Sequence, residues 1–498
     1  SSDLSSLASY FYRRAEKAAP QISLLSRVAV LVAGAICIGL CLFGIRGRMG
    51  YNPIKVSQAY YCEDPFLNQL GVNPVFNLLT STLDDNRKEN RTLHLMSEED
   101  ALSKVQKYLH RQGIDRLSPI ARKVEREGTP NRRNVVLVFM ESMSANLMGT
   151  FGSDKKLTPY LDSLYQQSLS FSHFYSSGIH TNHGIYSTLY SFPAIMKRNA
   201  MKGSVIPVYS GLPTVLQENG YCNLFFMTHE SQYDNMNAFL RTNGFDEIYA
   251  QENYPSEKVV NSFGVQDDFM YQYALPILNE RAGTGNPFFS VLLSISNHPP
   301  YVIPPYFHPH SDVLEEQIVE YADWSIRQFM QAAEKQPWFD NTIFVFLGDH
   351  GKMVGTPECE MPQSYNHIPL MIYGKDIKPG VYDGFGGQVD VSPTLLGLLN
   401  ISYLQNNFGV NLLEEERPCM FFTADNLIGA RDSVNMFIYS PDSQQEFKYK
   451  LEEGKLHAAT GTDEEAFRNL KDYCFSMLQS TESLVKEHKT LDKVSVKK

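Results

Sequence analysis

The chain has 498 residues, of which 43% are hydrophobic and 20% are charged. This composition is typical of globular proteins, and the length predicts one large domain with additions. The formal net charge of −11, from 55 acidic and 44 basic residues, excludes the basic surface on which nucleic-acid binding depends. No nucleic acid is therefore expected among its partners.

An uncharged apolar stretch near the start of the chain predicts a transmembrane helix. Residues 28–45 read VAVLVAGAICIGLCLFGI, with Arg27 and Arg46 on either side. Eighteen apolar residues are just long enough to cross a bilayer core, and the alternative is a buried core helix. The stretch begins too late, and lacks a cleavage site, for a typical signal peptide. Flanking charges do not orient it, and because the sequence begins with Ser, earlier spans could be missing.

The seven cysteines include no CxxC pair, so neither a cysteine zinc cluster nor a thioredoxin-like motif is expected. Two of them, Cys37 and Cys41, lie in the apolar stretch. Disulfides in an exported domain stay open, because their pairing cannot be read from the sequence.

Three regions follow the apolar segment. Residues 51–130 combine an apolar patch, a polar run at 84–91 and a helical pattern, which predicts a juxtamembrane helical connector. Residues 131–400 alternate short apolar runs with helical stretches, which is typical of buried parallel strands in an α/β sheet. Residues 401–498 contain shorter strands and a polar helix from Asp463, which predicts a small antiparallel subdomain. The expected division is 1–50 with the transmembrane helix, 51–130, 131–400 and 401–498.

Polar side chains follow four of the predicted strands. Glu141 follows the run 135–140, His229 follows 224–227, His298 follows 288–295, and Asp349 and His350 follow 343–347. Ligands of open α/β sheets bind outside the carboxyl ends of the strands, so these side chains are expected to meet at one edge. Singly, each has an ordinary explanation as a solvated loop residue or a hydrogen-bonded scaffold. Gathered carboxylates and imidazoles need a cation between them, and without cysteine the ligands suit Zn²⁺ or Mn²⁺.

Thr181, in the segment GIHTNHGIYSTL, stands just before a predicted helix that starts near Asn182. A hydroxyl there would meet the positive end of the helix dipole, which favours an anionic phosphoryl group. The alternative is a simple N-cap threonine. A neighbouring metal favours the catalytic interpretation, because coordination can generate an alkoxide at neutral pH.

With these residues in place, the chain resembles the alkaline-phosphatase superfamily and, within it, the lipoteichoic acid synthase and phosphoglycerol transferase group. The matching segments follow the family's order over most of residues 134–400, and residues 44–79 look like the stretch that joins this group's last membrane helix to its exported domain. The segments are NVVLVFMES, LTPYLDSL, GIHTNHG, SNHPPY, YADWSI, FLGDHG and QVDVSPTLLGLL. The resemblance implies a sulfatase-like, mostly parallel sheet flanked by helices.

The resemblance also implies a site and a reaction. One divalent metal, Mn²⁺ or Zn²⁺, would be held by Glu141, Thr181, Asp349 and His350. Thr181 would attack a phospholipid headgroup in line and form a covalent phospho-threonine, which a glycan, a polymer or water would then release. His298 would protonate the leaving group or bind a second metal. The catalytic domain would lie on the outer or periplasmic side of a bacterial cytoplasmic membrane.

Two positions depart from the synthase pattern. Near His229 the synthases carry a Trp and an Arg that hold glycerol phosphate; here the stretch has no Trp, and Arg241 is too far along, so Asp234 and Asn237 are the candidate replacements. The histidine before Pro at His367 matches phosphoethanolamine transferases and sulfatases instead. It would complete a second metal site with His298, or simply form a hydrogen bond at the start of a strand.

Several alternatives remain. A phosphoethanolamine transferase, a phosphodiesterase or a phosphatase would share the same central residues. Sulfate-ester hydrolysis by a formylglycine is not expected, because the chain has no C/S-x-P-x-R sequence. A non-catalytic membrane-anchored binding protein is the alternative of another class, and the presence of all four residues of the expected metal site speaks against it.

Overall fold

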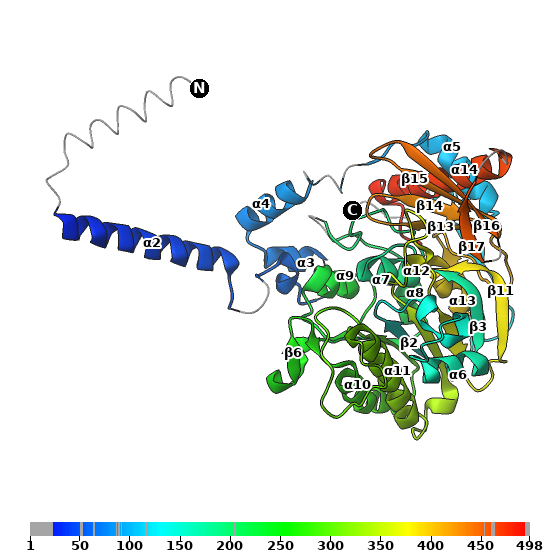
Figure 1. Ribbon diagram of the computed structural model, residues 1–498, viewed down its shortest axis with the longest axis horizontal. Helices are drawn as coiled ribbons and strands as arrows, with labels where there is room; N and C mark the ends of the chain where they lie inside the picture. The colour runs from blue at the N-terminus through cyan, green and yellow to red at the C-terminus, as the bar shows by residue number, and fades with distance from the viewer. Residues whose placement is uncertain are drawn as a thin grey trace. The chain divides into compact units, whose positions relative to one another are not determined.

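The structure, a computed structural model, describes residues 23–49, 53–62, 65–85, 87, 90, 92–114, 117–203, 206–452, 454–459 and 464–493. Residues 1–22, parts of the predicted polar run and Asp463, where we predict the last helix to begin, lie outside these ranges. The chain divides into two units, Ser1–Lys55 and Val56–Lys498. Figure 1 labels many of the helices and strands used below.

The first unit contains the long helix α2 (Leu24–Arg46), and the predicted span 28–45 lies inside it. Its side chains are exposed, and its most apolar window has a mean hydropathy of 2.8. Among the described residues, α2 is the helix that is long and apolar enough to cross a membrane. It ends at Gly47, whose φ of 79° lies in the left-handed region that glycine adopts readily.

The second unit is built on an eight-stranded sheet in the order β11-β3-β10-β9-β2-β8-β4-β5. Seven strands run in one direction and only β10 runs against them, which confirms the expected mostly parallel sheet. The strands are β2 (Asn134–Met140), β3 (Leu169–Tyr175), β4 (Cys222–Met227), β5 (Glu247–Tyr249), β8 (Phe288–Leu293), β9 (Thr342–Gly348), β10 (Leu370–Tyr373) and β11 (Gly380–Gly387).

Strand β2 shows why its sequence is apolar throughout. Val135 and Leu137 pack into one core and Val136 and Val138 into the other, because alternate residues of a strand point to opposite faces. Both faces are therefore covered by helices, as Figure 1 shows for α10 and α11 on one of them. One face carries α7 (Thr181–Tyr190), α8 (Leu212–Glu218), α9 (Met236–Thr242) and α13 (Val391–Leu398); the other carries α6 (Pro159–Gln167), α10 (Asp267–Ala282) and α11 (Leu314–Ala333).

Strands β3, β10 and β11 lack the long continuous apolar runs of β2, β4, β8 and β9. Strand β3 reads LSFSHFY, β11 contains three glycines besides its first residue, and β10 has only four residues. Such segments carry a weak strand signal, and their positions depend on neighbours distant in the chain. The two-stranded ribbon β6 (Val259–Asn261) and β7 (Gly264–Val265) is equally short.

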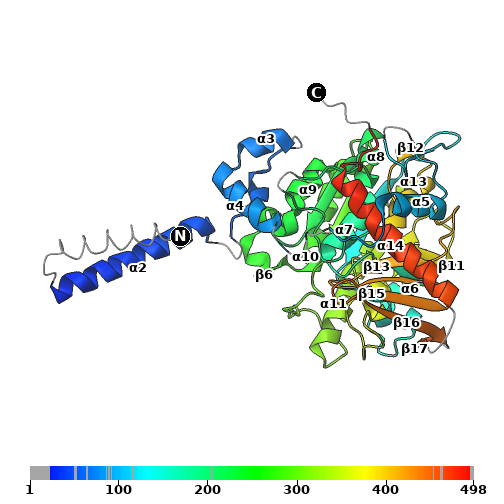
Figure 2. The same cartoon turned by 90° about the horizontal axis from the view of Figure 1, so that it is seen from above.

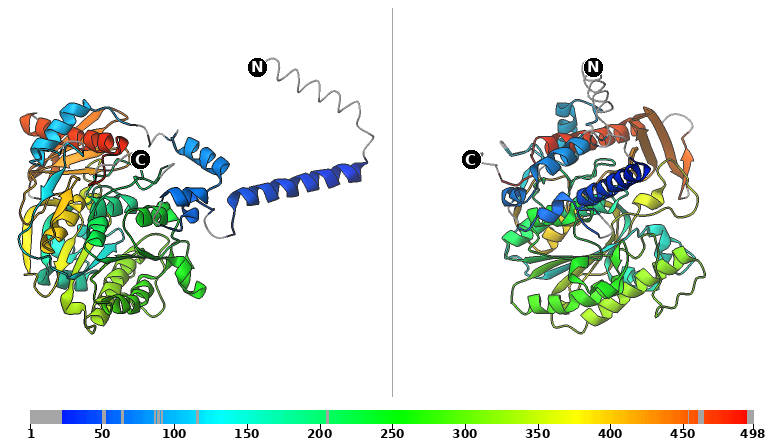
Figure 3. Two further views of the ribbon diagram at one scale, coloured as in Figure 1. Left: turned by 180° about the vertical axis from the view of Figure 1, so that it is seen from behind. Right: turned by 90° about the vertical axis from the view of Figure 1, so that its left-hand side faces the viewer.

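A five-stranded antiparallel sheet follows, which confirms the predicted C-terminal subdomain. Its order is β13-β14-β15-β16-β17, and α14 (Glu464–Lys486) packs against it, as Figure 3 shows. Although its sequence is largely polar, α14 buries one face, with Leu470, Leu478 and Leu484 at 2% exposure or less. The strands are β13 (Met420–Thr423), β14 (Ile428–Arg431), β15 (Asn435–Ser440), β16 (Gln445–Glu452) and β17 (Lys455–Ala458).

The predicted connector is helical in part and also contributes a strand. Helix α5 lies beside α14 (Figure 2), and the Leu95 N–H donates to Gln479 Oε1 at 3.0 Å. Strand β1, which the sequence did not indicate, pairs with β12 in an antiparallel ribbon. The connector elements are α3 (Pro65–Leu70), α4 (Pro74–Asp85), α5 (Glu98–Tyr108) and β1 (Arg122–Val124), and β12 is Tyr403–Gln405.

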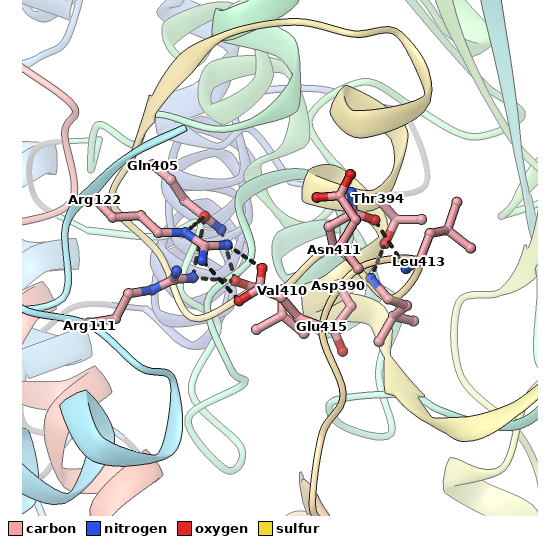
Figure 4. A network of polar contacts seen from close by, with 12 residues as sticks. Arg111, Arg122, Asp390, Thr394, Gln405, Val410, Asn411, Leu413 and Glu415 are labelled. Atoms are coloured by element: carbon pink, nitrogen blue, oxygen red, sulfur yellow. Dashed lines mark hydrogen bonds and ion pairs between the residues drawn. The ribbon is translucent and has the colours of Figure 1, made fainter. Parts of the chain in front are cut away.

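A polar network fixes the end of the connector to the segment after β12 (Figure 4). Arg111 donates to the Gly409 carbonyl at 2.8 Å, and Arg122 donates to Gln405 Oε1 at 2.8 Å. Arg122 also forms a two-pronged ion pair with Glu415. Burial, reinforced by the charge of Arg122, lowers the pKa of Arg111 to about 9.

Candidate functional site

The carboxyl ends of β2 and β9 bring three potential metal ligands together. The two strands are parallel neighbours in which Met140 pairs with Gly348, so the residues that follow, Glu141 and Asp349, lie side by side. One ligand atom each from Glu141, Asp349 and His350 lies within 4.8 Å of the others. His350 Nε2 is 3.8 Å from Glu141 Oε1 and 3.5 Å from Asp349 Oδ2. The structure thus assembles three of the four expected ligands through strand register.

The hydrogen bonds around this cluster leave its inner atoms for a cation. Asp349 Oδ1 accepts the N–H groups of Ser142 at 2.8 Å and His350 at 2.7 Å, while the buried Oδ2 has no hydrogen-bond partner in the described part of the chain. His350 Nδ1 must donate to the Gly351 carbonyl at 2.8 Å, so Nε2 is the ring nitrogen that faces the carboxylates. Burial and then the charge of Asp349 raise the pKa of Glu141 well above its usual range. A divalent cation would give Asp349 Oδ2 a partner and offset the repulsion between the Glu141 and Asp349 carboxylates. These residues therefore fit a divalent cation.

Thr181 is the first residue of α7 and points its hydroxyl at this cluster. Its Oγ donates to Glu141 Oε2 at 3.4 Å. The helix reaches the cluster because Gly184 packs on the backbone of Asp349, where an added Cβ would lie 2.3 Å from the Asp349 carbonyl oxygen. The N-terminal end of a ten-residue helix therefore faces the two carboxylates, at the place where an anionic group is favoured.

His298 and His229 lie near the cluster in defined tautomers. His298 Nδ1 donates to the Pro299 carbonyl at 2.6 Å, and its ring packs on Phe263 with centroids 4.1 Å apart. His229 Nδ1 donates to the Glu230 carbonyl at 3.0 Å, and its buried Nε2 has no partner among the described residues. Burial lowers the pKa of both imidazoles. Both rings are therefore neutral near pH 7.

The structure separates the two residues predicted to replace the missing Trp and Arg. Asp234 accepts from Asn182 Nδ2 at 3.0 Å, next to Thr181, and from Lys202 Nζ at 3.2 Å. Asn237 instead donates to the Tyr60 carbonyl at 3.3 Å, and so holds the connector. Asp234 is thus linked to the site through α7, and the amide of Asn237 is engaged elsewhere.

His367 is not part of the cluster. Its Nε2 donates to the Ser172 carbonyl at 2.8 Å, and its ring stacks on Tyr175 with centroids 5.3 Å apart. This is the hydrogen bond expected of a histidine at the start of a strand. Within the described ranges, the group of metal-ligating side chains includes neither His367 nor His298. The expected second metal site therefore gains no support from this geometry.

Sequence reasoning missed Lys352 and Asn297. Lys352 Nζ donates to Asn297 Oδ1 at 2.6 Å, and Asn297 Nδ2 donates to the Glu141 carbonyl at 3.0 Å. Burial lowers the pKa of Lys352 to about 8. The signal for both was their position, since each lies within two residues of a histidine already singled out.

Comparisons with known proteins agree with this geometry. The sulfatase family profile matches residues 133–401. The lipoteichoic acid synthase-like protein YvgJ of Bacillus subtilis is 25% identical over 362 residues, covering 66% of this chain and 56% of that protein. A lipoteichoic acid synthase of Staphylococcus aureus is 24% identical over 400 residues, covering 71% and 58%. The chain thus spans less than two thirds of the length of these curated relatives.

Solved structures show the same fold. A protein in the alkaline phosphatase superfamily from Vibrio parahaemolyticus superimposes with a TM-score of 0.71 and 25% identity, covering 79% of this chain and 97% of that one. The lipoteichoic acid synthase LtaP from Listeria monocytogenes superimposes with a TM-score of 0.63 and 22% identity, covering 77% and 98%. The fold, the strand-end cluster and the profile match over more than half of its length together establish that this chain belongs to the sulfatase family, within the alkaline-phosphatase superfamily.

Proposed function

We propose that this protein is a membrane-anchored, metal-dependent phosphoglycerol transferase that moves a phospholipid headgroup through a covalent phospho-threonine at Thr181. The observation that carries the proposal is the Thr181 hydroxyl, held 3.4 Å from Glu141 beside Asp349 and His350. The relatives named as lipoteichoic acid synthases and the apolar helix α2 support the substrate class and the anchor.

Glu141, Asp349, His350 and Thr181 would hold one Mn²⁺ or Zn²⁺. Carboxylate, imidazole and hydroxyl ligands without cysteine suit either ion. Such an ion, when bound, supplies the Lewis acid that neutralises charge on the transferring phosphoryl group. The buried Asp349 Oδ2, which has no hydrogen-bond partner among the described residues, and His350 Nε2 would be ligand atoms for it.

The protein's own residues define the two transfer steps. Glu141 Oε2 orients the Thr181 hydroxyl, whose Oγ attacks the lipid phosphorus as the bond to the diacylglycerol oxygen breaks. The Thr181 proton passes through His298 Nε2, a lone-pair acceptor in the observed tautomer, to that oxygen, which leaves as the diacylglycerol hydroxyl. In the second step an acceptor hydroxyl attacks the phospho-threonine and the Thr181 Oγ–P bond breaks. His298 takes the acceptor's proton and returns it to Thr181 Oγ, which regains its hydroxyl.

His229 and Asp234 would bind the lipid headgroup. His229 Nε2, which has no partner among the described residues, is a hydrogen-bond acceptor because Nδ1 carries the proton, and it suits a hydroxyl donor on glycerol. The acceptor would be an exported glycan or polymer, or water. We propose that the catalytic domain, residues 131–400, lies outside a bacterial cytoplasmic membrane, with 1–50 as anchor, 51–130 as connector and 401–498 as C-terminal subdomain.

Mass spectrometry of the Mn²⁺-loaded full chain in detergent tests the proposal. After incubation with phosphatidylglycerol, a phosphoglycerol adduct is expected on the peptide that holds Thr181. Thr181→Ala should lose the adduct and all turnover, whereas Thr188→Ala, on the same helix, should keep both. A phosphoethanolamine adduct formed from phosphatidylethanolamine would instead identify the alternative transferase. An active Thr181→Ala variant would overturn the covalent mechanism.

A further inference from the structure

A cavity of about 560 Å³ lies between the eight-stranded sheet and the C-terminal sheet. Glu141, Thr181, Asp349 and His350 do not line it. We call it the Arg431 pocket, and its main lining residues are His173, Tyr175, His367, Arg431, Lys455 and His457. Its volume lies in the range of small-ligand sites. The loop that follows His350 reaches it, because Val354 and Ser364 line one wall.

Arg431 is a buried cation that has no acidic partner among the described residues. It is 4% exposed, and within the described ranges no carboxylate oxygen lies within 4.0 Å of its guanidinium. It donates to Gln363 Oε1 and, at 3.3 Å, to the Asp432 carbonyl. With the Tyr175 hydroxyl as a further partner, these contacts still leave N–H donors of the five-donor guanidinium unused. A buried charge is normally paired, so this arginine has capacity for an anion.

The contrast with Arg417, another buried arginine close by in the sequence, is informative. Arg417 is 5% exposed and forms a two-pronged ion pair with Asp390, at 2.6 Å for both contacts. The fold therefore supplies a carboxylate to one buried guanidinium of this region and an open cavity to the other.

The walls of the Arg431 pocket suit an anionic group on a small organic body. The Arg431 guanidinium lies over the rings of Tyr175, at 5.4 Å, and Phe385, at 5.8 Å, which holds its plane in place. Lys455 on β17 adds a second cation at the rim. Glu358 is the carboxylate among the lining residues, and it accepts the Gln363 N–H at 2.7 Å. Cations thus outnumber carboxylates around the cavity.

We propose that the Arg431 pocket binds a phosphate or phosphodiester group, with Arg431 as its anchor and Lys455 as a second contact. The planar guanidinium matches phosphate oxygens in a two-pronged arrangement, which a lysine cannot reproduce. The same chemistry is carried by an anionic lipid headgroup and by a soluble glycerol phosphate. This site is separate from Thr181, so it does not depend on the transfer reaction proposed above.

Calorimetric titration of the full chain in detergent, with a chelator present and glycerol phosphate as the probe, tests this site. Arg431→Gln is expected to weaken binding at least about tenfold, since a charge-assisted contact is lost. Arg468→Gln, on the exposed side of α14, should bind as the unmodified chain does. Equal affinity in Arg431→Gln would overturn the proposal.

Two further variants keep the test decisive if Arg431→Gln does not fold. Arg431→Lys keeps the charge but loses the guanidinium fork, and Lys455→Gln changes only the rim, so each should weaken glycerol phosphate binding by several-fold. Unchanged affinity in both would contradict the assignment. Competition with phosphatidylglycerol vesicles then separates the sources: displacement of glycerol phosphate indicates a lipid headgroup, and its absence indicates the soluble form.

Discussion

Asp349 accepts two backbone N–H groups on one oxygen and leaves the other buried without a partner among the described residues. His350 repeats this division of roles, since its Nδ1 is held by the Gly351 carbonyl and its Nε2 faces the carboxylates. Each residue therefore anchors itself with one atom and presents the other inward. This preorganisation distinguishes a ligand set from carboxylates that merely happen to be close.

At the residue scale, Asp349→Asn should abolish metal-dependent stabilisation. The amide oxygen can still accept both N–H groups, so the fold is kept, but the buried negative charge is lost. We expect metal affinity to fall at least about tenfold, and the rise in Tm on adding Mn²⁺ to disappear. Elemental analysis and thermal unfolding with and without Mn²⁺ measure this. Asp340→Asn, at an exposed position, is the matched control. If Asp349→Asn bound as much metal as Asp340→Asn, the metal site would lie elsewhere.

At the scale of elements, two contacts among β2, β9 and α7 place the reactive groups. The register of β2 with β9 sets Glu141 beside Asp349, and the close approach of Gly184 to Asp349 sets the depth of α7. Because Thr181 is on the first turn of this helix, any movement of α7 moves the hydroxyl relative to Glu141.

Gly184→Ala should therefore be destabilising, against the usual trend. In a helix interior, alanine is normally favoured over glycine by about 0.5–1 kcal/mol. Here the added Cβ would lie 2.3 Å from the Asp349 carbonyl oxygen, so α7 has to move. We expect a net loss of about 1–3 kcal/mol in the free energy of unfolding and at least about tenfold slower adduct formation at Thr181.

Gly380→Ala is the control for this variant. Gly380 begins the edge strand β11, and no atom lies within 4 Å of the point that an added Cβ would occupy. Its free energy of unfolding should change by no more than about 0.5 kcal/mol. Equal stability and equal adduct rates in the two variants would show that the approach of α7 to Asp349 is not what positions Thr181.

Across the whole second unit, one buried ion pair joins segments far apart in the chain. Arg417 binds Asp390, which precedes α13, and also donates to the Phe408 carbonyl at 2.6 Å and to the Tyr473 hydroxyl of α14 at 3.2 Å. One guanidinium thus joins α14 to the segments before α13 and after β12, beside the apolar core that α14 and the C-terminal sheet share with the eight-stranded sheet. This region behaves as part of the main fold and not as an independent appendage.

Arg417→Met should lower the free energy of unfolding by about 3–5 kcal/mol, because it leaves the Asp390 carboxylate buried without a partner. The double variant Asp390→Asn with Arg417→Met should lose less, since no uncompensated charge remains. Chemical denaturation of the full chain measures both. Arg281→Met, which breaks the more exposed pair with Glu247, should lower the free energy of unfolding by no more than about 1 kcal/mol. An equally small loss in Arg417→Met would refute the role of the Arg417–Asp390 pair.

The sequence by itself determined the parallel core and the residues at its edge. Continuous apolar runs such as 135–140 and 343–347 are typical of strands buried on both faces, and a residue directly after such a strand lies at the sheet edge wherever the strand is placed. Glu141, Asp349 and His350 could therefore be predicted from the strand pattern alone. Thr181 stands before a helical pattern that by itself fits a simple N-cap threonine, and the expected metal and the family resemblance made it the candidate nucleophile.

Tertiary structure decided everything that depends on contacts between distant segments. The short or alternating strands β3, β10 and β11 gain their place from their neighbours, and β1 is a strand only because β12 pairs with it. Packing sets the side-chain directions of His367 and Asn237. Arg431 is buried, with no carboxylate partner among the described residues, only because the two sheets come together. Local sequence pattern carries the period of a strand or helix, whereas partners hundreds of residues apart are chosen by packing and register, which no local pattern contains.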